Sequence, residues 1–557
     1  MSAVSVSGCG ETDQTKPSYW IEKLEGDQAR TAINKLAEMK APESVDPLMK
    51  AFEKSTHRYE IIAALTKIGD KKAVPTLLAA LADVSDAKTG QLAGNTLLEW
   101  DAKEHLGEYL KVLANTKIKK ETKLAVMELL AKFADTPAAD QLVGMLELDP
   151  DIEPIVFLGL AAEGVGNIGA EKLGPERTKK AVDGLLRCMW LDDALGRNEV
   201  MNCRMALNKL GPKASADAII ATLERKNREV EKRARKFGFN VGGTIEFKTA
   251  ELLSDMKVDR ALDPLLAALT KVEEPTPAMQ ADGKKMNAFV MSGVQKVISI
   301  TNALALIGDE KAVDPMLKLV LDDESPLEKR LAAVQQLAFL GSQKPVKDLV
   351  KFFKSKDNLK AFGTQGFRLN VAITLGNLID GTDAKTFADF DKTINTVYDQ
   401  VDAALKKATA DYKTASKGAQ QGLAADIQGY REWLKGYTKV KEKLAVVKEC
   451  KDEVGCLVKK LDDEKTHVKV QAAHRLAQKA DAKDTVIKAL LARAGTEDMV
   501  VRNALLFGLD RLGDSSLVPE LQKIRDKDAE KAAKNKKLRG LVNVMDLTLA
   551  KMAHRGK

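Results

Sequence analysis

The sequence predicts an all-α fold, an α-solenoid of about twelve helical hairpins, and three observations lead to that prediction. The first is a repeated phrase, found at Ile68–Leu78, Ile307–Leu317 and Leu512–Leu521. Each copy has an apolar residue followed by Gly and Asp, a short polar stretch, and then Val with Pro close behind it. Gly is typical of a helix end and Pro of a first helical turn, so each copy predicts one helix ending and the next beginning. Repetition of such a unit is typical of stacked helical pairs.

Composition and length are the other two observations. A chain of 557 residues would ordinarily form several domains, whereas a solenoid has no such limit because each repeat contacts only its neighbours. Apolar residues make up 45% of the chain and aromatic residues only 5%, so the expected core consists mainly of Leu, Ala, Val and Ile. No apolar run approaches the roughly eighteen residues that span a bilayer, and the body of the protein is expected to be soluble.

A second pattern recurs within the repeats. An Asp precedes a helix that carries Arg or Gln among small residues, and the helix ends at Leu-Gly. Asp498–Gly513 contains Arg502 and Asp323–Gly341 contains Arg330, while Asp463–Leu476 follows the same order but lacks the final Gly. This pattern resembles HEAT repeats of the short bacterial type, and the resemblance covers most of the chain. The expected solenoid occupies residues 18–392 and resumes at 450–557.

The resemblance also implies which helices face inward. In that family the second helix of each pair lines the concave face, which here implicates the segments Val74–Leu81, Asp314–Val320 and Val518–Ile524. The repeats at 147–182, 224–250 and 270–300 carry extra residues, and we expect these to form long loops between helices. At the C-terminus, Leu541–Met552 is an apolar helix that is expected to cap the stack.

Residues 393–449 depart from the repeat pattern. Apolar residues from Ile394 to Ala419 alternate spacings of four and three, and a second such seam runs from Leu423 to Tyr437. This spacing predicts an inserted antiparallel helical hairpin, each arm roughly 30 Å long at 1.5 Å per residue. The hairpin either packs back on the solenoid or projects as an arm that grips a partner. Four tyrosines are the candidate partner contacts on it: Tyr398, Tyr412, Tyr430 and Tyr437.

The N-terminal segment, residues 1–17, resembles the processing site of bacterial lipoproteins. Val6-Ser7-Gly8-Cys9 matches the lipobox, in which the Cys becomes the lipidated first residue, and a short polar tether follows it. Only eight residues precede Cys9, without a basic region or a full apolar segment, which is a departure from a signal peptide. Cys9 is therefore the lipidation candidate, and the protein is expected to be anchored to a membrane in the bacterial envelope and to face the periplasm.

Four further cysteines form two candidate disulfides. Cys450 and Cys456 flank a five-residue turn at the base of the hairpin, and Cys188 and Cys203 lie on consecutive helices. Two bridges would suit an oxidising periplasm. The alternative is that all four are buried thiols that act as small hydrophobic residues.

Charge gives a weaker signal. Lys and Arg number 88 and Asp and Glu 80, a net charge of +8 that is small for this length and does not indicate a nucleic-acid-binding surface. The densest basic stretch contains the partner-surface candidates Arg225, Arg228, Arg233 and Arg235. Glutamates are interleaved with these arginines, which favours a solvated helix stabilised by ion pairs between residues four positions apart. The alternative is that the basic side chains form a patch that binds an acidic protein or an anionic headgroup.

Motifs for catalysis, cofactors and metals are missing or weak. Gly164–Gly169 matches G-x-G-x-x-G, but a helical segment precedes it where a dinucleotide site needs a strand. His467 and His474 are seven residues apart, too far for a typical helical metal pair, and are expected to be solvated. No residue is proposed as catalytic, cofactor-binding or metal-ligating.

Taken together, these features favour a non-enzymatic scaffold that binds a protein partner through its concave face and its helical arm, and that needs no cofactor. Two alternatives have a cytosolic location. One is a maturation factor or lyase similar to the phycobilin-lyase-like HEAT proteins, which would need a cofactor-sized pocket. The other is a nucleic-acid-binding repair protein, which would need a basic concave face.

Overall fold

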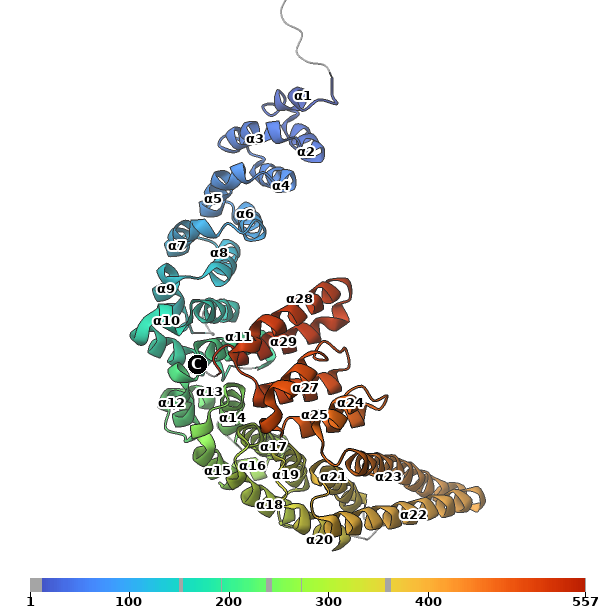
Figure 1. Ribbon diagram of the computed structural model, residues 1–557. Coiled ribbons are helices and arrows are strands. Elements are labelled where there is room, and N and C mark those ends of the chain that lie inside the picture. Colours follow the sequence, from blue (N-terminus) through green and yellow to red (C-terminus); the bar gives the residue numbers. More distant parts are fainter. Residues whose placement is uncertain are drawn as a thin grey trace, which may run out of the picture. The chain divides into compact units, whose positions relative to one another are not determined.

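The computed structural model describes residues 13–149, 154–191, 193–236, 243–271, 273–355 and 362–555. These residues form α-helices joined by short 3₁₀ turns, with no strand among them, which confirms the predicted all-α solenoid (Figure 1). The chain divides into two compact units, Met1–Leu210 and Gly211–Lys557. Each unit is described by itself.

Unit 1 stacks its helices in two rows. Its helices are α1 (Pro17–Ile21), α2 (Ala29–Met39), α3 (Val45–Phe52), α4 (Arg58–Ile68), α5 (Val74–Ala82), α6 (Ala87–Glu99), α7 (Leu106–Ala114), α8 (Lys120–Phe133), α9 (Ala139–Met145), α10 (Ile155–Cys188) and α11 (Asp193–Leu210). The first helices of the pairs, α2, α4, α6 and α8, form one row, and α3, α5, α7 and α9 form the other (Figure 1).

The repeated phrase forms the turn between the two helices of a pair. Gly69 ends α4 with a φ of 83°, a left-handed conformation that glycine adopts without steric cost. The Asp70 carboxylate then accepts a hydrogen bond from the Lys72 N–H at 2.9 Å and caps a 3₁₀ turn. Gly308 has the same conformation, whereas Gly513 has a φ of −82° and is extended, so not every copy ends its helix in the same way.

Small residues bring the first helices of unit 1 close together. A Cβ on Gly90 would lie 2.8 Å from Oγ1 of Thr122, and one on Gly94 would lie 2.7 Å from Cβ of Ala125. Both contacts are too short for any larger residue without movement of α6 or α8. The row of first helices is therefore packed more tightly than the row of second helices, and the array curves toward the first helices.

Unit 2 continues with longer and less regular pairs. Its helices are α12 (Pro212–Leu223), α13 (Arg228–Lys236), α14 (Thr244–Met256), α15 (Leu262–Thr270), α16 (Pro277–Gln280), α17 (Gly283–Ile307), α18 (Val313–Leu321), α19 (Leu327–Leu340), α20 (Val346–Ser355), α21 (Phe362–Leu378), α22 (Ala384–Thr414), α23 (Lys417–Cys450), α24 (Val454–Lys460), α25 (Thr466–Leu476), α26 (Lys483–Leu491), α27 (Met499–Leu512), α28 (Val518–Lys534) and α29 (Arg539–Met552).

In three repeats of unit 2, a buried arginine near the start of the first helix donates a hydrogen bond to a backbone carbonyl. Two of these arginines, Arg330 and Arg502, belong to the second sequence pattern. The Nε of Arg330 donates to the carbonyl of Val320 at 2.9 Å, and Arg502 donates in the same way to Thr496 at 2.8 Å. Arg368 on α21 donates to Phe353, although no Asp-Arg pattern marks it in the sequence. All three guanidinium groups are buried; Arg330 and Arg368 satisfy a carbonyl near the end of the preceding helix, and Arg502 satisfies one in the loop after that helix.

Unit 2 folds back on itself, so that α25 to α29 face α14 to α19. Lys551 on α29 forms an ion pair with Asp255 of α14 at 3.1 Å, and the Lys257 ammonium donates to the carbonyl of Arg511 at 2.8 Å. Arg555 donates to the carbonyl of Asp255, 300 positions away in the sequence. α29, which was expected to cap the end of the stack, packs against α27 and α28 of the last repeat and also joins them to α14.

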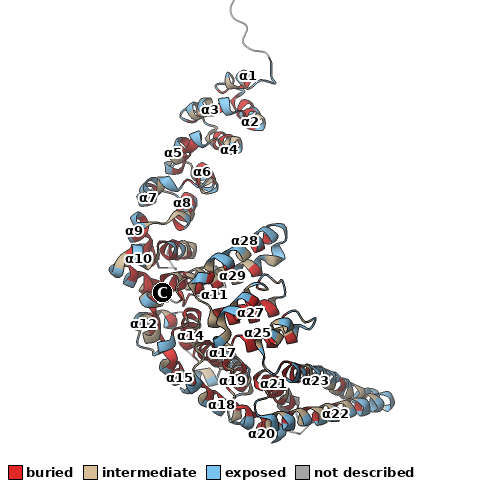
Figure 2. Ribbon diagram, in the orientation of Figure 1, coloured by how far each residue is buried: buried red, intermediate tan, exposed pale blue. Residues whose placement is uncertain are grey.

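The long hairpin consists of α22 and α23, and it is not an insertion. α22 is the second helix of one repeat and α23 the first helix of the next, and both are extended beyond the array. Near the base, Phe390 contacts Phe353 of α20, and Gly436 lies against Leu369 of α21. The hairpin begins at Ala384 and ends at Cys450, so the expected bounds of 393–449 exclude part of its base. The far ends of both helices are largely exposed (Figure 2).

The long loops expected at 147–182, 224–250 and 270–300 are wrong for the residues that the structure describes, because these segments are mostly helical. α10 occupies most of the first segment and bends at Gly169 and Gly174, where φ is 77° and 74°. One described helix, α17, is long and apolar enough to cross a membrane, with a mean hydropathy of 1.4. It packs between α14 and α19, and 56% of its apolar window is buried, as in the core helix of a solenoid.

Candidate functional site

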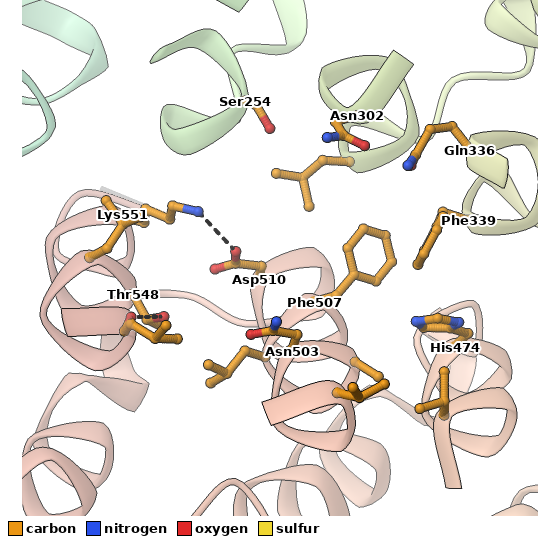
Figure 3. A pocket seen from close by; sticks show the side chains of 17 residues that line it. Ser254, Asn302, Gln336, Phe339, His474, Asn503, Phe507, Asp510, Thr548 and Lys551 are labelled. Carbon is orange, nitrogen blue, oxygen red and sulfur yellow. Dashed lines mark hydrogen bonds and ion pairs between the residues drawn. The ribbon is translucent and has the colours of Figure 1, made fainter. Parts of the chain in front are cut away.

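The fold-back of unit 2 encloses a cavity of about 630 Å³, which is the size of many small-molecule sites. α14, α17 and α19 form one wall, and α25, α27 and α29 form the other (Figure 3). The lining combines apolar side chains with a few polar groups: Ser254, Asn302, Gln336, Phe339, His474, Asn503, Phe507, Asp510, Thr548 and Lys551 are among them.

An aromatic cluster joins the two walls of the cavity. The Phe339 ring of α19 lies 4.3 Å from the His474 ring of α25 and 4.9 Å from the Phe507 ring of α27, between ring centroids. Both contacts are edge-to-face, the arrangement that aromatic rings prefer. This cluster could not be predicted from the sequence, because Phe339 is more than a hundred residues away from both His474 and Phe507.

His474 is buried, and the expectation that it is solvated was wrong. Only 8% of the residue is exposed, and Nδ1 has no hydrogen-bond partner. Burial, with a smaller contribution from the charge of Lys443, lowers the pKa of His474 to about 3. The imidazole is thus neutral at physiological pH; the residue contributes to the cavity wall, and its Nδ1 is buried and unsatisfied.

The remaining polar groups lie on either side of the aromatic cluster. Asn302, Gln336 and Asn503 come from three different helices and supply amide donors and acceptors (Figure 3). At the other end Lys551 lies 3.1 Å from Asp255 and 3.8 Å from Asp510. The cavity can therefore hold a partly aromatic molecule with hydrogen-bonding edges. No group of His, Cys, Asp and Glu in the described ranges could hold a metal ion.

The cavity shows that the prediction of inner helices was wrong for unit 2. The first helices of the pairs, including α17, α19, α25 and α27, line it, while the second helices α18 and α28, which contain two of the predicted inward segments, do not. The physical reason is that the last repeats fold back onto the first-helix side of α14, α17 and α19, where Lys551 pairs with Asp255 and Phe339 packs against His474 and Phe507. The third predicted segment, Val74–Leu81, lies on α5, which belongs to the second row of unit 1.

The basic stretch is divided between internal ion pairs and an exposed surface. The Arg225 guanidinium bonds to both carboxylate oxygens of Glu231 and lies 3.3 Å from Glu246, which is 1% exposed. Arg225 is thus a structural cation, and Arg233 is half-buried on α13. Arg228 and Arg235 are exposed and line a recess with Lys232 and Lys271.

The four tyrosines of the hairpin differ in exposure. Tyr437 is 1% exposed and lies against Phe353, and burial raises its pKa to about 12, so it does not belong to a partner surface. Tyr430 packs against Trp433, and the ring of Tyr398 lies under the Lys441 ammonium at 4.4 Å. Tyr412, close to the tip, is 37% exposed and is the one large exposed hydrophobic side chain described on the hairpin.

The cysteines form two disulfides in the structure. Cys188 bonds to Cys203, which joins α10 to α11, and Cys450 bonds to Cys456 across the turn between α23 and α24. That turn contains two residues of positive φ, Lys451 and Asp452, and the Asp452 side chain is held by Arg475 at 3.0 Å. Cys9, the lipidation candidate, lies outside the described residues.

Gly164–Gly169 has the structural role that its position in the repeat suggested. All six residues lie within α10, and a Cβ on Gly164 would be 2.8 Å from Leu142. Gly169 adopts positive φ where the helix bends. Among the described residues before the segment there is no strand, and the segment lies inside a helix, which a dinucleotide-binding turn does not.

Comparisons with known proteins agree with a repeat fold. The family model for HEAT repeats matches residues 20–97. No curated protein matches the chain. Among solved structures, the karyopherin Kap121p bound to the extreme C-terminus of the protein phosphatase Cdc14p is 14% identical, with a TM-score of 0.41, covering 96% of this chain and 71% of that one.

Two other solved structures are similar to the chain. Importin beta is 12% identical with a TM-score of 0.41, over 96% of this chain and 76% of that one. An engineered protein is 14% identical with a TM-score of 0.28, over 88% and 98%. These scores are too low to support more than a general likeness. The family model shows HEAT repeats at residues 20–97, and the same Gly-Asp-Pro phrase and the same helical pair recur in both units beyond the matched residues, so the rest of the chain is similar to these repeats.

Proposed function

We propose that this protein is a non-enzymatic scaffold that binds a protein partner, and that the far half of the α22–α23 hairpin is a contact arm. The observation that carries the proposal is the way the hairpin is supported. Its base contacts α20, α21 and α25, whereas toward the tip Val401 and Ala408 of α22 are covered by α23. A pair of helices that extends beyond the repeats adds little to the hydrophobic core. Its length is explained if the exposed part forms an interface with another protein.

The tip offers a suitable contact residue. Tyrosine is enriched at protein interfaces because it buries a large ring while keeping a polar hydroxyl, and Tyr412 is 37% exposed. Tyr59, on α4 of unit 1, is 36% exposed and therefore provides a matched control.

Site-specific photo-cross-linking tests the arm. A benzophenone amino acid placed at position 412 in the native host is expected to give a discrete protein adduct, and the same group at position 59 is not. The same adduct from both positions would indicate nonspecific proximity. No adduct from position 412, with the variant folded by circular dichroism, would rule out the arm as a contact.

We further propose that Cys9 is lipidated and anchors the protein in the bacterial envelope, facing the periplasm. The two disulfides support this location, because such bonds persist in oxidising compartments and are rare in a reducing cytosol. A mass spectrum of the protein made from its native locus, with a peptide map run without reduction, tests both points. A lipid-modified Cys9 and two linked peptide pairs are expected. An unmodified N-terminus with four free thiols would place the protein in the cytosol.

A second candidate function is favoured by the cavity of unit 2. Its volume of about 630 Å³ and its lining by aromatic rings and amide side chains suit a small partly aromatic ligand, as the cytosolic maturation-factor or lyase alternative requires. Native mass spectrometry of protein purified from its own host tests this function. A bound mass that is lost in the His474→Gln variant would support it, and protein without any bound mass at neutral pH would argue against it.

A further inference from the structure

Two recesses adjoin each other on the surface of unit 2, away from the hairpin and the central cavity. One, of about 760 Å³, lies at α13, and the other, of about 590 Å³, lies between α15, α17 and α18. Lys271 and Glu273 line both recesses, so together they make one continuous surface. We call the first the basic recess and the second the apolar groove.

The basic recess has an excess of unpaired positive charge. Arg228, Lys232 and Arg235 are spaced by four and three residues on α13, which places them on one helix face, and all three are exposed. No described acidic side chain forms an ion pair with any of them. The glutamates of the recess are already occupied, since Glu231 bonds to Arg225 and Glu273 lies 3.8 Å from Arg225 and 3.9 Å from Lys271.

The apolar groove is built on the N-terminal end of α17. Met286, Phe289 and Val290 line it together with Leu269 of α15 and Leu319 of α18. All three α17 residues are only half-buried, and Met291 beside them is 48% exposed. Methionine and a single aromatic ring provide an adaptable apolar surface of the kind that accepts peptide side chains. Lys318 and Lys329 lie at the rim of the groove.

We infer that this surface docks a short segment of a partner protein in which apolar side chains are followed by a run of carboxylates. The inference concerns a second contact beyond the arm and rests on the proposed scaffold function. Charge complementarity selects the carboxylates for the basic recess, and burial of aliphatic or aromatic side chains fills the groove beside it. A single-stranded nucleic acid is held mainly by successive bases stacked on several aromatic rings, and Phe289 is the one aromatic residue that lines the groove.

A peptide-binding experiment tests the inference on the full-length protein. The probe is a fluorescein-labelled peptide in which leucines and a phenylalanine precede a run of glutamates, and binding is followed by fluorescence anisotropy. The triple variant Arg228→Glu, Lys232→Glu, Arg235→Glu is expected to weaken binding by about tenfold or more. Phe289→Ser is expected to weaken it by a similar factor without changing its salt dependence, because it removes apolar contact and no charge.

A charge-matched control separates a docking site from general attraction. Lys523, Lys527 and Lys531 are exposed and lie on one face of α28, so replacing all three by Glu gives the same change in net charge. Binding should be unchanged in this control. Equal losses in both triple variants would overturn the inference, and so would equal binding of a peptide with the same residues in shuffled order.

Vesicles test the other occupant that an apolar and basic surface could accept. The Cys9→Ser variant, which cannot carry a lipid at this position, is expected not to bind vesicles of phosphatidylcholine with phosphatidylserine, and vesicle binding that is lost when Phe289→Ser is added would replace the peptide by a membrane. Failure of this inference is distinguishable from failure of the proposed function. If the wild-type protein does not bind the peptide but still gives the cross-link at position 412, the docking surface alone is refuted. If it binds the peptide but gives no cross-link at position 412, the arm alone is refuted.

Discussion

The two units of this protein use the same helical pair but differ in how far their contacts reach along the chain. In unit 1 the hydrogen bonds between helices join residues about one repeat apart, as from Asn202 to the carbonyl of Gly159, 43 positions away. In unit 2 Arg555 bonds to Asp255 across 300 positions, and Lys257 bonds to Arg511 across 254. Unit 1 is thus close to a one-dimensional array, whereas unit 2 is a repeat array closed by tertiary contacts.

The closing contacts share one chemistry. Long basic side chains of the last repeats reach backbone carbonyls near helix ends of earlier repeats: Arg511 donates to Phe339 and Leu340, Arg475 donates to Ile379, and Arg555 donates to Asp255. The final carbonyls of a helix lack partners within the helix, so each is a ready acceptor. The comparison of the two units predicts that the long-range contacts make the repeats of unit 2 unfold more cooperatively. Each repeat is still stabilised by its own local contacts.

The largest effect is expected from a local contact inside one repeat of unit 2. Arg502 and Asp528 form an ion pair at 2.8 Å with side-chain exposures of 0% and 2%. Arg502→Ala leaves a buried carboxylate without its partner and should lower the free energy of unfolding by about 3–5 kcal/mol in urea denaturation. Arg493→Ala, which breaks an exposed pair with Asp462, should cost at most about 1 kcal/mol. Similar losses in both variants would contradict the assigned burial.

Removal of a closing contact should have a smaller but more widespread effect. Arg511→Met deletes the hydrogen bonds to the carbonyls of Phe339 at 2.5 Å and Leu340 at 3.4 Å, at a cost of about 1.5–3 kcal/mol. Hydrogen exchange should rise at the end of α19 and at the end of α14, where Lys257 meets Arg511, as well as in α27.

The hydrogen-exchange measurement on Arg511→Met has an internal reference and a result that would contradict closure. Exchange in unit 1 should not change, which makes it an internal reference. If exchange rises in α27 alone, the arms are independent and unit 2 is not closed by these contacts.

The pH dependence of stability should also distinguish the two units. The folded pKa of His474, about 3, is below the ordinary value of 6.5, so the unfolded chain takes up the proton first. The stabilisation is complete above pH 6.5 and decreases by about 1.4 kcal/mol per pH unit below it, until the folded pKa is reached. Unit 2 should therefore lose about 2 kcal/mol between pH 6.5 and pH 5 from this residue.

Because carboxylates also titrate at low pH, the His474→Gln variant is the reference. The difference in urea midpoint between wild type and this variant should change with pH below 6.5 and stay constant above it. A constant difference down to pH 5 would mean that the imidazole is accessible to protons in the folded state.

The sequence predicts those features of the fold that depend on residues close together in the chain. The helix end at Gly69, the cap at Asp70 and the helix that starts at Val74 follow from residues within one phrase, and all are present in the structure. The seam of the hairpin also follows from local spacing. Closure of unit 2 does not, because it joins residues such as Gln478 and Ala338 that are 140 positions apart. His474 was therefore expected to be solvated, although its own helix was predicted.

The inner row was mispredicted for a related reason. The side of the array that becomes concave depends on how closely adjacent first helices approach each other. That spacing is set by pairs such as Gly94 and Ala125, which lie on different repeats. Two small residues in the sequence do not reveal that they face each other.

The smallest predicted effect tests the two halves of one helix in unit 2. Gly436 lies at the base of α23, where a Cβ would be 2.5 Å from a terminal methyl group of Leu369, and Gly422 lies near the tip, where nothing is within 4 Å. Gly436→Ala should therefore lower stability by about 1–2 kcal/mol through overpacking. Gly422→Ala should raise the stability of the hairpin by about 0.5–1 kcal/mol, because alanine favours an exposed helix interior. Hydrogen exchange of α22 and α23 measures both changes. If Gly422→Ala also destabilises the hairpin, the tip packs against another part of the protein and is not a free arm.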